Sequence, residues 1–179
     1  MKMKFLYAGL YNSDKAWKSG NHSHDFLEFI GVQGGKARVE YRGKAYDIKD
    51  SAILVYEPGV KHSEVSTEAS PLKFSYLGVD MKTRGQKHAP LFKSNGLMVI
   101  DSPRKVKAGL GIIAEIYRES ETRELGWRQV IDANIYKFLR LIAHDCRSAG
   151  DANAAAAPAG LLRRRQIVEK VKTYIKSHS

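Results

Sequence analysis

Three histidines and one glutamate stand at spacings that could bind a metal ion or a polar ligand. His22, His24 and Glu28 form the pattern His-x-His-x-x-x-Glu, and His62 closes the run PGVKH. In an extended strand side chains alternate, so the first three would project from one face. Imidazole nitrogens and a carboxylate oxygen are suitable donors for divalent zinc, nickel, manganese or iron. The sequence therefore predicts a site made of these four residues.

The elements that must position this site are short strands separated by turn residues. One segment, 36–42, alternates cleanly between apolar residues and charged ones, which is typical of a strand with one wet face. Segment 52–56 is continuously apolar, as expected of a strand that is covered on both faces. Strands at this spacing, with turn signals between them, indicate an all-β sandwich or barrel. The predicted strands are 5–11, 26–33, 36–42, 45–48, 52–56, 72–79 and 95–100.

The hydrophobic period changes after the last predicted strand. Ser102 suits a helix N-cap and Pro103 a first helical position. Apolar residues then recur at helical spacing in two segments, with a break near Gly126. The second stripe, which includes Ile135 and Phe138, is wide enough to face both the barrel and a second subunit. We expect this helical pair to form a dimer interface.

The C-terminal part of the sequence has a different composition. Residues 149–160 are small and rich in alanine, which is typical of a linker. Residues 161–179 resume a helical pattern with many basic side chains. The run from Arg163 to Arg165 could contact phosphates, or it could be a solvated helix face.

Length, composition and charge limit the class of protein to which this chain could belong. The chain has 179 residues, which suits one domain with an appendage, and no apolar run approaches the ~20 residues that span a bilayer. Its single cysteine, Cys146, lies in a helical apolar pattern, so we expect a buried thiol and a cytoplasmic location. The formal net charge of +11 fits either a nucleic-acid partner or a basic solvated surface.

Two motifs resemble those of a known superfamily. The spacing of His22, His24 and Glu28, with Gly35 seven residues later, is similar to the first motif of the cupin superfamily. The run PGVKH is similar to the second motif, although the usual Pro-x-Gly is contracted and Ser66 stands where Asn is common. The resemblance implies a jelly-roll β-barrel that holds a metal, a small ligand, or both.

Together with the helices, the chain resembles the N-terminal part of an AraC-type (AraC/XylS family) transcriptional regulator. The resemblance implies a mainly β fold, in which the barrel is followed by an antiparallel helical dimerisation segment. It also implies a small-molecule effector, a homodimer, and contact with DNA through a C-terminal domain absent from this chain; no membrane contact is expected. The implied regions are 1–100 for the effector-binding barrel, 101–148 for dimerisation, 149–160 for the linker and 161–179 for the first helix of the truncated DNA-binding domain.

Several functional alternatives stay open at this point. The four polar residues could hold a metal, hydrogen-bond an effector, or form an internal network. Tyr41, Phe74 and Tyr76 are candidates for lining the ligand pocket, although aromatic residues at strand spacing are often plain core. No catalytic residue is predicted, so a non-catalytic sensor is favoured. The alternative is a metal-dependent cupin enzyme, such as an isomerase or a dioxygenase.

Overall fold

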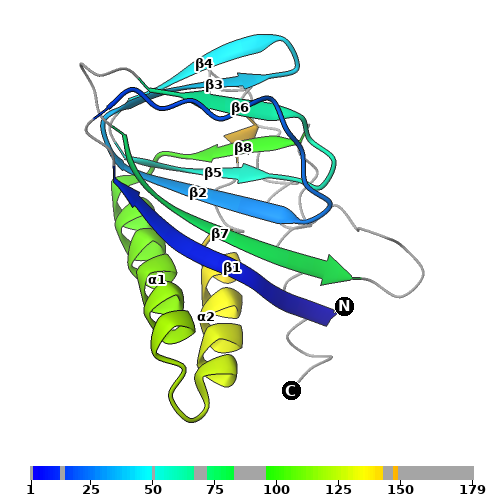
Figure 1. Cartoon of the computed structure of the whole chain (residues 1–179), viewed down its shortest axis with the longest axis vertical. Coiled ribbons are helices and arrows are strands. Elements are labelled where there is room, and N and C mark those ends of the chain that lie inside the picture. The colour runs from blue at the N-terminus through cyan, green and yellow to red at the C-terminus, as the bar shows by residue number, and fades with distance from the viewer. Residues whose placement is uncertain are drawn as a thin grey trace, which may run out of the picture.

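The described part of the chain folds into two antiparallel sheets and a pair of helices (Figure 1). A computed structural model describes residues 2–12, 15–49, 51–66, 72–82, 96–142 and 147–148. The larger sheet has the order β1-β7-β2-β5-β8-β9, and the smaller has the order β4-β3-β6. The elements are β1 (Lys2–Asn12), β2 (Leu27–Gly34), β3 (Lys36–Tyr41), β4 (Lys44–Lys49), β5 (Ala52–Tyr56), β6 (His62–Val65), β7 (Lys73–Lys82), β8 (Leu97–Ile100), α1 (Pro103–Thr122), α2 (Trp127–Ile142) and β9 (Arg147–Ser148).

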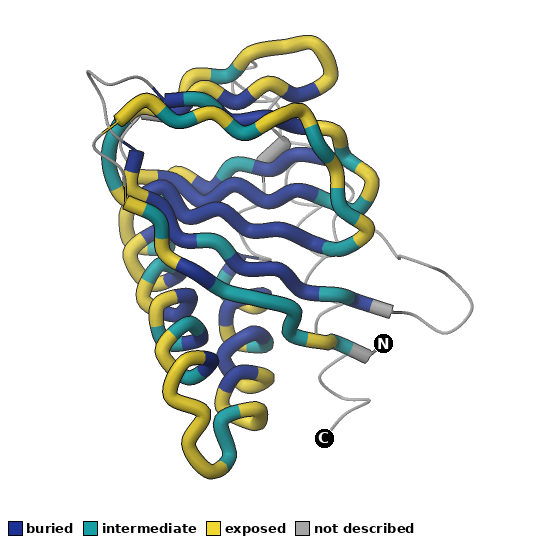
Figure 2. Tube along the Cα trace, in the orientation of Figure 1, coloured by how far each residue is buried: buried dark blue, intermediate teal, exposed yellow. Residues whose placement is uncertain are grey.

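Three layers result from this arrangement, with the large sheet in the middle (Figures 1 and 2). One apolar core lies between the two sheets and draws residues from β2, β5 and β7 on one side and from β3 on the other. A second core lies between the large sheet and both helices. The mainly β fold with two C-terminal helices confirms the predicted fold class, and the facing sheets form the predicted jelly-roll barrel.

Strand sequences follow from their place in these layers. All five residues of β5 are buried, because helices cover one face of this strand and the small sheet covers the other. In β3, buried and exposed residues alternate, and Lys36, Arg38 and Glu40 are exposed. The two patterns therefore predicted correctly which strand lies inside and which faces water.

Helix α1 approaches the large sheet closely through a glycine. A Cβ atom at Gly109 would lie 2.5 Å from Cδ1 of Ile53 and 3.1 Å from a ring atom of Phe138. Gly111 is exposed, and a Cβ there would meet no atom within 4 Å. The two glycines that weaken the helix in sequence terms therefore differ: Gly109 permits packing, whereas Gly111 has no packing role.

This difference gives a prediction for stability. Gly111→Ala should raise the free energy of unfolding by about 0.5–1 kcal/mol, because alanine loses less backbone entropy in a helix. Gly109→Ala should be less stable than Gly111→Ala by about 1–3 kcal/mol, because the added methyl group overpacks the contact with Ile53. Urea denaturation of both variants measures the two changes. Equal effects of the two substitutions would contradict the close approach of α1.

The structure corrects three expectations from the sequence. Strand β6, which begins at His62, was missed, and β7 continues to Lys82 instead of ending at 79. Ile135 and Phe138 are fully buried in the core between the helices and the large sheet. Neither residue can therefore contact a second subunit in the folded chain.

Some expectations lie outside the described residues. These are the buried thiol at Cys146, the linker at 149–160 and the basic helix at 161–179. Among the described helices, none is long and apolar enough to cross a membrane.

Candidate metal and ligand site

The segment before β2 passes from the small sheet to the large one and carries two of the histidines. The backbone N–H of His22 donates to the carbonyl of His62 at 3.0 Å, and the N–H of His62 returns the bond at 3.0 Å. The N–H of Gly59 donates to the carbonyl of His24. Glu28 follows as the second residue of β2. Because β2 begins only at Leu27, strand alternation is not what brings His22 and His24 to Glu28, contrary to the expectation.

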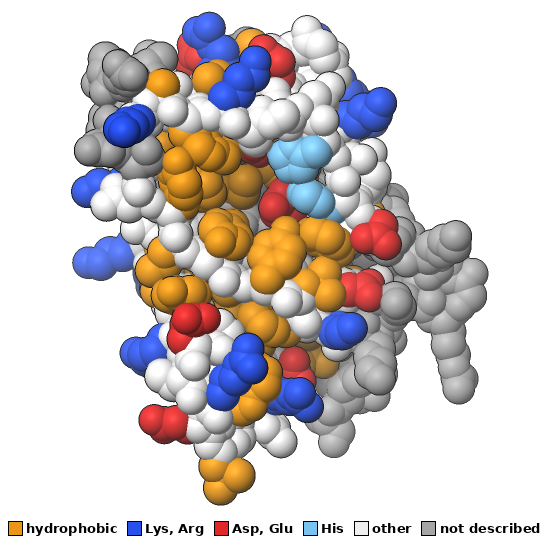
Figure 3. Space-filling view, viewed as in Figure 1, with side chains coloured by type: hydrophobic (Ala, Val, Ile, Leu, Met, Phe, Trp, Pro, Cys, Tyr) orange, Lys and Arg blue, Asp and Glu red, His pale blue; other side chains and the backbone are white. Residues whose placement is uncertain are grey.

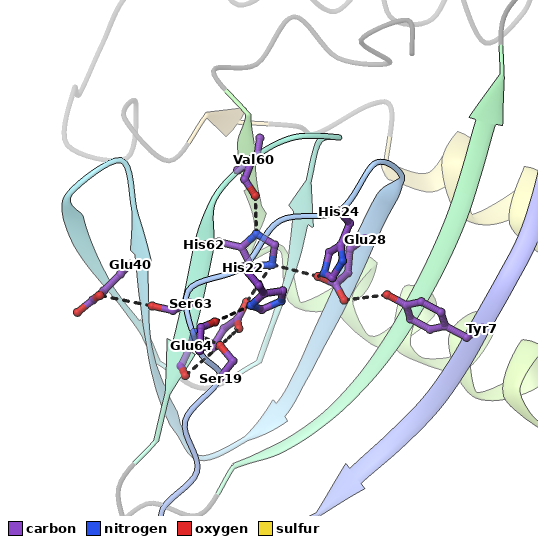
Figure 4. A network of polar contacts seen from close by, with 11 residues as sticks. Tyr7, Ser19, His22, His24, Glu28, Glu40, Val60, His62, Ser63 and Glu64 are labelled. Atoms are coloured by element: carbon purple, nitrogen blue, oxygen red, sulfur yellow. Dashed lines mark hydrogen bonds and ion pairs between the residues drawn. The ribbon is translucent and has the colours of Figure 1, made fainter. Parts of the chain in front are cut away.

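The structure brings together the four residues predicted to form the site (Figure 4). One potential ligand atom from each residue lies within 4.8 Å of all the others. Oε2 of Glu28 is 3.1 Å from Nε2 of His24 and 3.1 Å from Nε2 of His62. His62 and Glu28 are buried, whereas His22 and His24 are partly exposed. The cluster therefore has a buried side and a side that a ligand can reach.

Backbone carbonyl groups select the tautomers of two of the imidazoles. Nδ1–H of His62 donates to the carbonyl of Val60 at 2.9 Å, and Nδ1–H of His22 donates to the carbonyl of Gly20 at 2.6 Å. In the neutral form this leaves an Nε2 lone pair on each ring. Nε2 of His24 is buried, and it lies 3.1 Å from Oε2 of Glu28 without the geometry of a hydrogen bond.

The cluster consequently needs a positive charge. A neutral His62 would point its Nε2 lone pair at Oε2 of Glu28, which is also an acceptor. Either a proton on His62 or a cation among the four atoms removes this repulsion. Carbonyl groups that orient imidazole ligands in this way are common around metal sites. The donor set and its orientation therefore fit a divalent metal.

The electrostatics of the cluster favour a proton on His62 when no cation is bound. Burial opposes protonation, but the bonds to Glu28 and to the Val60 carbonyl outweigh it, so the pKa of His62 is raised above 6.5. Burial lowers the pKa of His24, and the Glu28 carboxylate only partly offsets this effect. For Glu28, burial raises the pKa, but hydrogen bonding and charge from His62 and His24 lower it overall.

Three polar residues near the cluster were missed in the sequence. The hydroxyl of Tyr7 donates to Oε1 of Glu28 at 3.1 Å, and burial raises the pKa of Tyr7, so the phenol keeps its proton. The ring of Tyr56 stacks on His62, with centroids 3.7 Å apart. Glu64 is buried, 3.9 Å from Nε2 of His62, and accepts a hydrogen bond from Ser19 at 2.7 Å. Recognition of β6 would have placed His62 and Glu64 on one face, since they are two residues apart.

The predicted pocket-lining residues fall into two places. The ring centroids of Phe74 and Tyr76 are 6.1 Å apart. The centroid of Phe74 also lies 4.9 Å from that of Tyr11 and 5.0 Å from that of Trp17. Tyr41 is a buried core residue, and its hydroxyl lies close to the backbone at Gly96. Figure 3 shows a broad gathering of hydrophobic side chains beside the histidines on one face of the molecule.

Three solved structures are similar to parts of this chain. ToxT from Vibrio cholerae is 14% identical, with a TM-score of 0.45 over 62% of this chain and 48% of that one. KdgF from Halomonas sp. is 20% identical, with a TM-score of 0.35 over 42% and 76%. The conserved SPY1581 protein of unknown function from Streptococcus pyogenes is 15% identical, with a TM-score of 0.38 over 46% and 75%. A comparison with curated proteins finds no match.

The family comparison covers most of the sequence. Residues 7–139 match the model of the AraC-like ligand binding domain. This range includes all four cluster residues, together with β2 and β6, which carry two of them. It also includes α1 and most of α2. The match confirms the resemblance drawn from the sequence: the chain belongs to the family of AraC-like ligand binding domains.

Proposed function

We propose that this chain is the effector-sensing and dimerisation region of a cytoplasmic AraC-type transcriptional regulator. It binds a small molecule between its two sheets and does not transform it. The observation that carries this proposal is the convergence of His22, His24, Glu28 and His62 beside a partly exposed aromatic surface. The membership of the AraC-like ligand binding domain family supports a regulatory role for that site.

A divalent metal at the cluster is part of the proposal. His24 and His62 would bind it through Nε2 and Glu28 through Oε2, the atoms that approach one another. His22 would bind it through Nε2, because its Nδ1 is bonded to the Gly20 carbonyl. When bound, the metal supplies a positive charge that attracts an anionic group of the effector. The partly exposed rings of His22 and His24 leave that group a way in.

A chain of aromatic rings leads away from the cluster. The ring of His24 stacks on Phe26 at 4.6 Å, and Phe26 meets Tyr7 at 5.6 Å. Tyr7 contacts Tyr76 at 5.9 Å, and Tyr76 leads to Phe74. Rings of this kind stack well on flat apolar groups. The effector class that we propose is therefore a small carboxylate with a planar apolar body.

A thermal-shift experiment tests this function. Zinc-loaded untagged protein is heated with benzoate, with 4-hydroxybenzoate, and with glucose as the neutral comparison. We expect the aromatic carboxylates to raise the melting temperature, and His62→Ala or Phe74→Ala to abolish the increase. Stabilisation by glucose alone, or stabilisation that both variants retain, would contradict the proposed site. Conversion of the added compound, followed by chromatography, would instead indicate the metal-dependent enzyme.

The affinity for zinc should depend on pH in a predictable direction. A metal binds only neutral imidazole, so protons compete with zinc. Because the pKa of His62 is raised, this competition should begin above pH 6.5, at a higher pH than for an ordinary histidine. Competition titrations with a chromophoric chelator between pH 8 and pH 5 measure the effect. An affinity that stays constant down to pH 5 would contradict binding through His62.

Dimerisation and DNA binding remain parts of the proposal. The dimer surface would use exposed residues of the helical hairpin, such as Leu125, in place of Ile135 and Phe138. Contact with specific DNA would come from a C-terminal domain. We expect the chain alone to bind DNA weakly and without sequence preference, through charge only.

A further inference from the structure

An irregularity in β1 turns Tyr7 toward the candidate site. Phe5 lies opposite Val79 of β7, so an unbroken register would place Tyr7 opposite Leu77, but Tyr7 lies opposite Gly78. Before the irregularity, Met3 and Phe5 pack against the core on the helix side, and after it Ala8 does so. Regular alternation would have put Tyr7 on the helix side with Phe5. The extra residue therefore brings Tyr7 to the face that carries Glu28.

A glycine on the neighbouring strand leaves space for the Tyr7 ring. Gly78 of β7 lies opposite Tyr7 of β1 and also opposite Glu28 of β2. A Cβ atom at position 78 would lie 2.7 Å from two ring atoms of Tyr7, so the ring occupies the space that a side chain would fill. Across this gap, the Tyr7 hydroxyl reaches Oε1 of Glu28 at 3.1 Å (Figure 4).

The two carboxylate oxygens of Glu28 have different partners. Oε1 of Glu28 accepts from Tyr7, whereas Oε2 faces His24 and His62 at 3.1 Å each. We propose that Tyr7 is a positioning residue, which holds Oε1 so that Oε2 is fixed toward the imidazoles and toward the cation bound there. This inference rests on the proposed function, because it takes Oε2 as a ligand atom. Partners of this kind orient carboxylate ligands in metal sites.

The chain offers a matched control for Tyr7. Tyr46 of β4 lies opposite Val39 of β3 and packs against the core between the sheets. The described partners of Glu28 are Tyr7, His24 and His62, and Tyr46 is not among them. Loss of the Tyr46 hydroxyl should therefore leave Glu28 in place.

Metal binding by the two phenylalanine variants tests the inference. Zinc affinity is measured by competition with a chromophoric chelator, and the visible spectrum of bound cobalt reports changes in the ligand arrangement. We expect Tyr7→Phe to weaken zinc binding about 10- to 100-fold and to change the cobalt spectrum. Tyr46→Phe should stay within about twofold of the unmodified chain, because that hydroxyl does not touch a ligand. Circular dichroism should show both variants folded.

Each outcome decides between clear alternatives. Unchanged affinity and spectrum in Tyr7→Phe would overturn the positioning role while leaving the metal site intact. Failure of the unmodified chain to bind zinc or cobalt would instead contradict the metal part of the proposed function. In that case, crystal structures of the unmodified chain and of Tyr7→Phe test the inference, because they show the orientation of the Glu28 carboxylate in each. A rotated Glu28 in the variant supports the role, and an unmoved Glu28 refutes it.

Discussion

Replacement of His62 by alanine should weaken zinc binding by more than about 100-fold, because it removes a direct ligand from the cluster. His62 is the ligand that comes from the small sheet, and it is only 2% exposed. Its loss would leave His22, His24 and Glu28 to hold the ion with one side of the site uncovered. Isothermal titration with zinc, on protein without an affinity tag, measures the change.

The adjacent Lys61 provides the control for this experiment. Lys61 is exposed and lies next to His62 in the chain, so Lys61→Ala should leave the zinc affinity unchanged. Circular dichroism is needed for His62→Ala, since the stacked Tyr56 ring loses its neighbour. Equal zinc binding by folded His62→Ala and by the unmodified chain would contradict the metal site. The four residues would then be left as polar groups that bind the effector directly or stabilise the fold.

Of the substitutions predicted to affect stability, Phe138→Ala should cause the largest decrease in the free energy of unfolding. This side chain is fully buried between α2, α1 and the large sheet, and its ring meets Phe29 of β2 edge to face at 5.0 Å. Removal of a buried phenylalanine side chain lowers the free energy of unfolding by about 3–5 kcal/mol. Total stabilities of domains are about 5–15 kcal/mol, so Phe138→Ala should lose a large fraction of the stability of the fold.

Val130 on the same helix gives the comparison. It is 37% exposed, so Val130→Ala should change the free energy of unfolding by less than about 0.5 kcal/mol. Urea denaturation of both variants at one protein concentration measures the difference. If Phe138→Ala lost no more stability than Val130→Ala, Phe138 could not lie in the core that joins helices to the large sheet. Its place at a subunit interface would then have to be reconsidered.

The sequence predicted most of the strands and both helices because their hydrophobic patterns are local. Alternation in 36–42 and the apolar run 52–56 report directly whether one or both faces are covered. Strand β6 was not predicted because it has only four residues. Three of them are polar yet buried: His62, Ser63 and Glu64. Their burial depends on the segment 17–22, which covers β6 through backbone bonds that no local pattern predicts.

The members of the four-residue cluster could be predicted from the sequence, but its assembly could not. The four ligand candidates were found by residue type and spacing, and the structure places them together. The expected route, one face of one strand, was wrong because the chain crosses between sheets before β2. Tyr7 could not be found by alternation, since the irregularity after Phe5 breaks the pattern that would have been used. Contacts made across three strands depend on register, which spacing alone does not give.

The central claim is that His22, His24, Glu28 and His62 form one cation site on which effector recognition is built. Crystal diffraction from zinc-loaded, untagged protein, recorded on both sides of the zinc absorption edge, tests it most directly. We expect one anomalous peak per chain, among the Nε2 atoms of the three histidines and Oε2 of Glu28. No peak at these atoms in a folded, zinc-saturated crystal, or a single peak elsewhere on the chain, would contradict it.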